Sequence, residues 1–169
     1  MRTIRNLAIA SAAVAGVALF TAGPASALTV YGTNYSDTLY GTSYADEISG
    51  YDGDDSIYGY AGSDLLKGGY GHDYLQGDDG ADFLKGGYGN DYIWAGSGDD
   101  RLKGGKDSDS LVPDVGSDVI RAGDGNDYLY VYGDGGADLV KCGPGYDVVY
   151  YDYVDFGDEF YGCDNFIQV

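Results

Sequence analysis

One aliphatic residue recurs in every nine positions along most of the chain, in units that begin at Gly32. When each unit is numbered from its first residue, position eight is Leu, Ile or Val in all thirteen units between residues 32 and 150. The insertion Val131–Tyr132 is the one break in this register. A lone aliphatic residue between two variable ones is typical of a short strand that turns one side chain inward, so we predict strands at positions seven to nine.

The six residues before each predicted strand are rich in Gly, which is found where a chain bends or approaches another backbone closely. A single unit can bury only one aliphatic side chain, whereas stacked units build a continuous core. Alternate units can form two parallel sheets with the aliphatic side chains between them, so that one turn takes two units. The pattern predicts an all-β fold, a β-helix solenoid of stacked nonapeptide repeats over residues 28–150.

Position six is Asp in all thirteen units. In such a stack the Asp of every second unit would line up along one edge about 4.8 Å apart, which is unfavourable for like charges. A cation between successive carboxylates reverses the sign of this interaction. Ca²⁺ accepts six or more oxygens, including carboxylates and backbone carbonyls, whereas Mg²⁺ prefers stricter octahedra and retained water. The sequence therefore favours several bound Ca²⁺ ions.

The units 68–76 and 86–94 read G-G-x-G-x-D-x-(aliphatic)-x and resemble the hemolysin-type (RTX) calcium-binding repeat. The resemblance implies a right-handed parallel β-roll with about five to seven Ca²⁺ sites between loops on the same edge. It implies carboxylate ligands from position six, namely Asp55, Asp64, Asp73, Asp82, Asp91, Asp100, Asp109, Asp118, Asp127, Asp138 and Asp147. It implies carbonyl ligands from early loop positions, namely Gly50, Gly59, Gly68, Gly77, Gly86 and Gly104.

Some units depart from the pattern. Tyr35 and Tyr44 replace the Gly at position four of the first two units, which we interpret as an N-terminal cap. Asp107 at the same position of unit 9 and the insertion at 131–132 are expected to disturb the sites beside them. The C-G-P-G segment at 142–145 and a late Gly-Cys-Asp resemble the ends of small exported actinobacterial repeat proteins.

The first residues predict export. Arg2 and Arg5 precede an apolar run over 7–20, and an Ala-Ser-Ala site ends at Ala27, so residues 1–27 are predicted to be a signal peptide. The alternative, a membrane anchor, is disfavoured because the run is short and no charged stop-transfer segment follows it. We therefore expect a secreted protein with no membrane span.

The net charge is −19, and it becomes −21 when Arg2 and Arg5 are removed with the leader. So negative a chain argues against nucleic acid as a partner, because phosphate binding requires basic side chains. It is suited to a cation, and most of its acids are Asp, the short carboxylate that fits turns and metal loops.

Cys142 and Cys163 are the two cysteines of a chain that we expect to be exported, so a disulfide between them is predicted. Closing a loop of that length stabilises the folded state by about 3 kcal/mol in the chain-entropy model. Two free thiols or a metal pair are the alternatives, and a single His argues against zinc. Residues 151–169 are interpreted as an aromatic C-terminal cap tied by this disulfide.

Position nine differs between alternate units, which predicts two different outer faces. When the units are numbered from the one that begins at Gly32, the even-numbered units place Lys67, Lys85, Lys103, Arg121 and Lys141 at position nine. These residues predict a basic row on one sheet. The other sheet should carry an aromatic row that includes Tyr58, Tyr74, Tyr92, Trp94, Tyr128 and Tyr130, with Tyr70 and Tyr88 near the same edge. These rings could stack on an extracellular polysaccharide or cell wall, and the basic row could touch an anionic polymer. Alternatively, both residue types simply suit exposed strands.

No catalytic set is expected. His72 is the only His and fills a variable loop position, and no Ser/His/Asp or Cys/His arrangement can be assembled. The sequence predicts a non-enzymatic extracellular Ca²⁺-binding protein that folds on binding the ions. The alternative is a cell-surface adhesin or polysaccharide-binding protein that uses the roll as a scaffold. Ice binding is disfavoured because only Thr33, Asn34 and Thr42 resemble a regular Thr/Asn array, and a polysaccharide-modifying enzyme is disfavoured by the missing catalytic domain.

Overall fold

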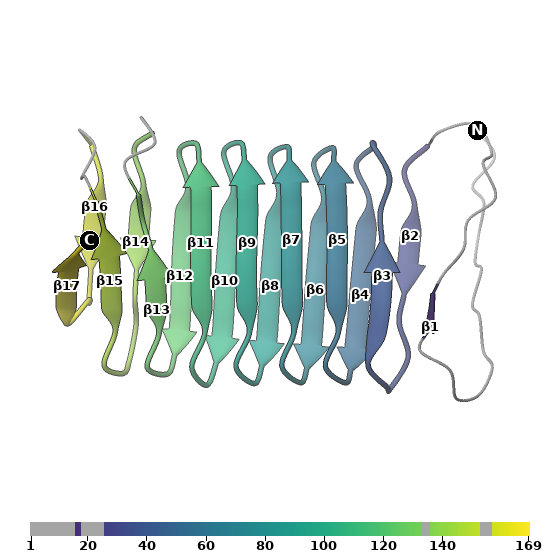
Figure 1. Cartoon of the computed structure of the whole chain (residues 1–169), viewed down its shortest axis with the longest axis horizontal. Coiled ribbons are helices and arrows are strands. Elements are labelled where there is room, and N and C mark those ends of the chain that lie inside the picture. Colours follow the sequence, from purple (N-terminus) through teal and green to yellow (C-terminus); the bar gives the residue numbers. More distant parts are fainter. Residues whose placement is uncertain (1–15, 18–25, 133–135, 153–156) are drawn as a thin grey trace.

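The computed structural model describes residues 16–17, 26–132, 136–152 and 157–169, and within these ranges every regular element is a strand. The strands form two sheets in which all hydrogen-bonded neighbours run parallel (Figure 1). The odd sheet contains β1 (Gly16–Val17), β3 (Asp37–Tyr40), β5 (Ser56–Ala61), β7 (Tyr74–Asp79), β9 (Tyr92–Ser97), β11 (Ser110–Val115), β13 (Tyr128–Tyr130), β15 (Val148–Tyr151) and β17 (Asn165–Gln168). The even sheet contains β2 (Thr29–Tyr31), β4 (Glu47–Asp52), β6 (Leu65–Tyr70), β8 (Phe83–Tyr88), β10 (Arg101–Lys106), β12 (Val119–Asp124), β14 (Leu139–Lys141) and β16 (Glu159–Tyr161).

The chain crosses from one sheet to the other after every nonapeptide, so that strands two units apart are neighbours. Leu66 pairs with Leu84, and Leu84 pairs with Leu102, each eighteen residues further on. Across the insertion the offset becomes twenty residues, since Ile120 pairs with Val140, and the register of the stack is kept. The predicted all-β parallel β-roll of stacked nonapeptides is confirmed.

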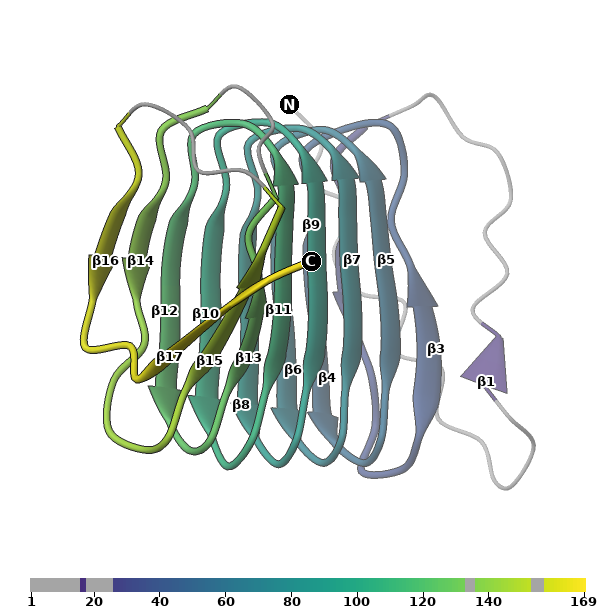
Figure 2. The same ribbon diagram turned by 60° about the vertical axis from the view of Figure 1, so that its left-hand side comes forward.

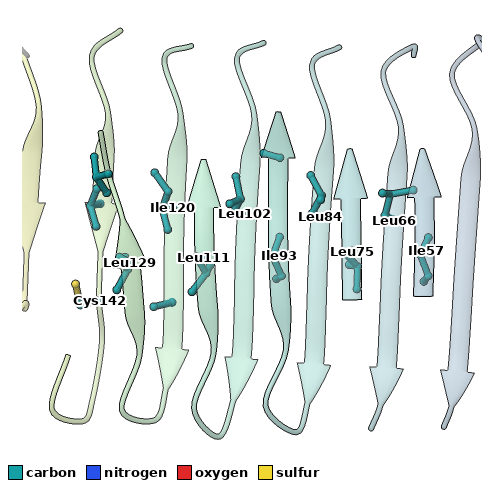
Figure 3. Packing of buried hydrophobic residues seen from close by; sticks show 14 of the residues in the cluster. Ile57, Leu66, Leu75, Leu84, Ile93, Leu102, Leu111, Ile120, Leu129 and Cys142 are labelled. Carbon is teal, nitrogen blue, oxygen red and sulfur yellow. The ribbon is translucent and has the colours of Figure 1, made fainter. Parts of the chain in front are cut away.

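The core lies between the two sheets and consists mainly of the position-eight residues (Figure 3). Ile57, Leu75 and Ile93 enter it from the odd sheet, and Leu66 and Leu84 enter it from the even sheet, all fully buried. Each buried Leu or Ile contributes about 1.5–3 kcal/mol of hydrophobic free energy, so stability accumulates unit by unit. Four more fully buried residues extend the core, namely Ala95, Ala122, Val131 and Cys142.

The central strands are six residues long, so the three-residue strands predicted from the sequence were too short. Each strand continues through positions one to three of the next unit, where Gly69 still pairs with Gly87 of the neighbouring strand. Position two takes a left-handed conformation even where it is not Gly, as at Tyr60 with a φ of 77°. The glycine-rich segment therefore belongs partly to the strand and only partly to the turn.

This extension places Tyr70 and Tyr88 differently from the prediction. Both residues occupy position three of an odd unit, but they end β6 and β8 of the even sheet. They lie beside the basic row and not beside the aromatic row, because a strand begun by an even unit crosses the unit boundary.

The turn itself depends on position four. Gly71 has a φ of 131°, and a Cβ there would overlap the Gly53 carbonyl of the preceding turn. In unit 9 Asp107 holds the same position with a φ of 72°, so the replacement of Gly keeps the shape of this turn. Asp also carries a short polar side chain that tolerates the left-handed region better than most residues.

Residues 157–169 continue both sheets, as the turned view in Figure 2 shows for β16 and β17. Phe160 pairs with Val140 and Phe166 with Val149, so aromatic rings follow the aliphatic positions. The predicted disulfide between Cys142 and Cys163 is confirmed and ties this end to the roll.

At the other end, the predicted signal peptide falls almost wholly outside the described residues; its two residues in β1 pair with β3. In the part of the chain that the structure describes, no helix has the length and hydrophobicity needed to cross a bilayer.

Candidate metal centre

The position-six Asp side chains point into the roll and form two ladders, one for each sheet. From Asp55 to Asp147 the Oδ1 atom of each rung accepts a hydrogen bond from the backbone N–H of the Asp two units earlier, for example from Asp73 to Asp91 at 2.9 Å and from Asp64 to Asp82 at 2.7 Å. All eleven Asp residues predicted as ligands are at most 3 % exposed, namely Asp55, Asp64, Asp73, Asp82, Asp91, Asp100, Asp109, Asp118, Asp127, Asp138 and Asp147. The ladder crosses the insertion unbroken, since Asp127 donates to Asp147 at 2.9 Å.

The second carboxylate oxygen has a different environment. Within the described residues, the Oδ2 atom is buried without a hydrogen-bond donor in Asp55, Asp64, Asp73, Asp82, Asp91, Asp100, Asp109, Asp127 and Asp147. A buried charged oxygen without a partner is strongly unfavourable. The structure therefore contains two rows of oxygens that require a positive partner or a proton.

The first two units are the exception. The backbone N–H and the hydroxyl of Thr33 donate to Oδ2 of Asp37 at 2.6 and 2.8 Å. Thr42 gives Asp46 the same two bonds, at 2.5 and 2.9 Å. No later unit has Thr or Ser at position two. These two units therefore satisfy their carboxylates with their own donors.

Position one completes the local geometry. A Cβ on Gly59 would lie 2.5 Å from Oδ2 of Asp64 and 2.9 Å from the carbonyl oxygen of Gly77, two units further on. The missing side chain thus leaves a small space lined by oxygens from two successive turns. In the same way the carbonyls of Gly50 and Gly68 face the position-one glycines of the preceding turn.

The six predicted glycines are all buried, and at each of them the Oδ2 atom of the Asp in the same unit lies close to the place that a Cβ would occupy. These glycines are Gly50, Gly59, Gly68, Gly77, Gly86 and Gly104. Beside Gly77 and Gly104 the facing carbonyls belong to Ala95 and Ala122. The sequence prediction did not include these two residues, because it assigned carbonyl ligands only to Gly. Any residue type has a backbone carbonyl.

Burial controls the charge of the ladders. It raises the pKa of Asp55, Asp64, Asp91 and Asp100 to about 7 and the pKa of Asp109 to about 8, with neighbouring Asp carboxylates adding to the effect. The N–H donor on Oδ1 lowers the pKa of each group in part. Near neutral pH these carboxyls are poised between a neutral and a charged form.

The comparison with protein families agrees with this geometry. The family model of the RTX calcium-binding nonapeptide repeat matches residues 31–66, 58–87, 67–102, 76–111, 104–140 and 114–149. The chain belongs to the RTX calcium-binding nonapeptide repeat family. A search of curated proteins finds no match to the chain.

Ca²⁺ fits the donor set of this RTX roll. Among the described residues no three His, Cys, Asp or Glu side chains converge on one point. A stack with one inward Asp per unit brings only adjacent rungs together, so backbone carbonyls must supply the remaining ligands. Ca²⁺ accepts such mixed oxygen ligands, whereas zinc sites are built from Cys and His.

His72 of the RTX roll is part of a second ladder at position five. Its Nδ1 accepts the Asn90 N–H at 2.8 Å, and its own N–H donates to Asp54 at 2.7 Å. The acceptors along this edge are Ser36, Asp54, His72, Asn90, Ser108 and Asn126. The imidazole therefore has a structural role in the turn.

Two ladder residues of the RTX roll lie in the segment that was interpreted as a cap. Asp158 accepts the Asp138 N–H at 2.9 Å, and Asp164 accepts the Asp147 N–H at 3.0 Å. The nine-residue period is lost in this segment, and aromatic residues stand at the aliphatic positions. The repeat pattern therefore did not identify Asp158 and Asp164 as ladder residues. The remaining signal is an acidic residue two positions before a Phe.

The aromatic residues named from the sequence all belong to the odd sheet: Tyr58 in β5, Tyr74 in β7, Tyr92 and Trp94 in β9, and Tyr128 and Tyr130 in β13. Tyr74 and Tyr92 stack with centroids 5.5 Å apart. The Trp94 indole N–H donates to Asp114 at 2.9 Å. The rings form an ordered outer face opposite the basic row of the even sheet.

Proposed function

We propose that the chain is an extracellular, non-enzymatic Ca²⁺-binding protein whose folding is coupled to binding several Ca²⁺ ions. The observation that carries this proposal is the contrast along the Asp ladders. Oδ2 receives two hydrogen bonds from Thr33 or Thr42 in the two N-terminal units and has no donor among the described residues in unit after unit beyond them. The proposed ligands are the position-six carboxylates and the position-one carbonyls of the turn that follows.

The buried Asp carboxylates of the chain couple its folding to Ca²⁺ binding. Without a cation, folding buries carboxylates whose raised pKa values show that the charged form is disfavoured there. Bound Ca²⁺ supplies positive charge to oxygens from two successive turns. A ligand that binds only the folded state stabilises that state in proportion to the logarithm of its concentration. Extracellular modules of this kind work with Kd values of about 10⁻⁴ to 10⁻³ M.

Two features support an extracellular location. The first 27 residues have the charge and hydrophobicity pattern of a signal peptide. The Cys142–Cys163 disulfide would persist in an oxidising compartment.

The test is a Ca²⁺ titration of residues 28–169 followed by far-UV circular dichroism, with Mg²⁺ as the control ion. We expect a cooperative gain of β signal with Ca²⁺ only. Asp91→Asn should raise the Ca²⁺ concentration at the midpoint, because its Oδ2 loses its charge. The matched variant Asp37→Asn should leave the midpoint within about twofold, since Thr33 already satisfies that carboxylate. A chain that is fully folded in excess chelator at pH 8, or equal shifts in the two variants, would contradict the proposal.

A second candidate function is polysaccharide binding by the aromatic face. A hollow of ≈ 290 Å³ is lined by Tyr92, Val112, Tyr130 and Tyr132. A hollow lined by aromatic and aliphatic side chains suits the flat, apolar side of a sugar ring. Affinity electrophoresis in a neutral polysaccharide tests this candidate: Tyr130→Ala should abolish retardation, and Tyr31→Ala on the even sheet should not. Equal mobility of all three proteins would exclude it.

A further inference from the structure

The basic residues of the described chain are confined to one face. Every Lys and Arg in the described ranges lies in a strand of the even sheet, namely Lys67, Lys85, Arg101, Lys103, Lys106, Arg121 and Lys141. The strands of the odd sheet have none. In a protein with a net charge of −19, such complete separation gives the two outer faces opposite character.

Five of these residues form one line, which we call the basic row: Lys67, Lys85, Lys103, Arg121 and Lys141. Successive members are direct partners in neighbouring parallel strands. Neighbouring strands lie about 4.8 Å apart, and like charges directly opposite each other on a sheet are destabilising. The row therefore carries an unfavourable repulsion along the axis of the roll.

Among the described residues, acidic side chains do not neutralise the middle of this row. Lys67 pairs with Glu47 at 2.8 Å at one end, and Lys141 lies over the Tyr161 ring at the other. Within the described residues, Lys85, Lys103 and Arg121 between them have no acidic partner, and all three are exposed. A counter-charge from outside the molecule would convert the repulsion into binding energy.

A strip without side chains runs beside the basic row. Gly69, Gly87, Gly105 and Gly123 are partners on successive strands of the even sheet. Beyond the strip, Tyr70 and Tyr88 stack at 4.5 Å with nearly parallel planes, and both are exposed. The basic row thus runs along one side of a glycine strip that follows the long axis of the roll, and the two stacked rings stand on the other side, where Lys106 Nζ lies 4.9 Å from the centroid of the Tyr88 ring.

We propose that the outer face of the even sheet binds a linear anionic polysaccharide, which lies along the roll with its carboxylates against the basic row and its sugar rings beside the exposed Tyr70 and Tyr88. A polymer is required because the cations recur over five strands. A ring-containing polymer is favoured because the exposed side chains of Tyr70 and Tyr88 lie alongside the row. A stacked nucleic acid strand carries a charge about every 3.4 Å, which does not match cations about 4.8 Å apart.

The strands of the odd sheet have acidic side chains and no Lys or Arg to offset them, which confines the polymer to the even face. Asp78 and Asp114 accept hydrogen bonds from Gln76 and Trp94 within the aromatic row. They would repel carboxylates there. The proposal goes beyond Ca²⁺ binding, because it assigns a partner to a face that contains none of the position-six residues.

The experiment measures binding of the Ca²⁺-saturated protein to carboxymethyl cellulose and to hydroxyethyl cellulose, which share a backbone and differ in charge. We expect binding to the first that weakens steeply with NaCl, and little binding to the second. Poly-L-glutamate, a ring-free polyanion, and oligothymidylate serve as further probes and should both bind at least about tenfold more weakly than carboxymethyl cellulose. Circular dichroism in the same buffer confirms that each protein is folded, which separates failure of this proposal from failure of Ca²⁺-coupled folding.

A pair of variants with equal net charge makes the test specific. Lys85→Gln with Lys103→Gln removes two positive charges from the basic row and should weaken binding about tenfold or more. Ser56→Asp with Ser110→Asp adds two negative charges to the odd sheet and should change binding less than about threefold. Equal losses in the two variants would mean that overall charge and not the row governs binding, and tighter binding of either further probe would overturn the assignment to a polysaccharide.

Discussion

At the scale of single residues, the two carboxylate oxygens of each position-six Asp separate two requirements. Oδ1 only has to accept an N–H, and the position-five ladder shows that Ser36, His72 or Asn90 can do this equally well. Position six nevertheless is Asp in every unit. Beyond the first two units, where Thr33 and Thr42 donate to Oδ2, the invariance follows from the charge of Oδ2, which no Ser, His or Asn supplies, and it supports a cation as the partner of that oxygen.

The raised pKa values predict a stability profile for the metal-free protein that is the reverse of the usual one. Burial raises the pKa of Asp91 from 3.8 to about 7 and the pKa of Asp109 to about 8. The folded state therefore holds protons that the unfolded chain has already released, so stability falls as pH rises from about 4 to about 8. In excess chelator we expect more β signal by circular dichroism at pH 5 than at pH 8.

Protons and Ca²⁺ compete for the same oxygens, so the Ca²⁺ midpoint should move to higher concentration as pH falls from 8 to 5. A midpoint that is unchanged over this range, or a chelated chain that gains structure as pH rises, would contradict the assignment of the buried carboxyls as the controlling groups.

At the scale of one strand, neighbouring leucines have opposite roles. Leu66 is fully buried between the sheets, whereas Leu65 lies at position seven on the outer face and is partly exposed. Leu66→Ala should lower the free energy of unfolding by about 2–5 kcal/mol, because it leaves a cavity in a core one residue deep per unit. Leu65→Ala should lower it by less than about 1 kcal/mol.

Urea unfolding in saturating Ca²⁺ measures both leucine variants against the unchanged chain. Similar losses in the two variants would show that the inward and outward positions of the strand were assigned wrongly.

The strands also show how far the repeat could be read from the sequence. Period nine identified the inward position-eight residues from Leu39 to Val149 and both rows of Asp, because each depends on residue type at a fixed position, but it did not identify the buried Ala95, Ala122, Val131 and Cys142. It misplaced Tyr70 and Tyr88, because strand ends depend on backbone pairing across the unit boundary and leave no mark in side-chain type. The Oδ2 environment was equally hidden, since it depends on which way a carboxylate turns.

At the scale of the whole molecule, the disulfide fastens the last turns to the stack. Cys142 is fully buried, and Cys163 lies in the short segment between β16 and β17. Cys163→Ser should lower the free energy of unfolding by about 2–4 kcal/mol, measured by urea unfolding in saturating Ca²⁺. Reductant should destabilise the unchanged chain by a similar amount and leave the variant unaffected. A variant as stable as the unchanged chain would show that the terminal turns hold without the bond.

The hydrogen bonds of the Asp ladders all point the same way along the roll. Each buried N–H is satisfied by a carboxylate that the chain supplies only about twenty residues later, as when Asp118 donates to Asp138 and Asp138 in turn donates to Asp158. A turn therefore cannot complete its interior until its successor is in place. For a chain that leaves a translocation pore N-terminus first, this means that each turn can complete its interior only after one further turn has emerged, so that closure of the roll follows emergence with a lag of about twenty residues.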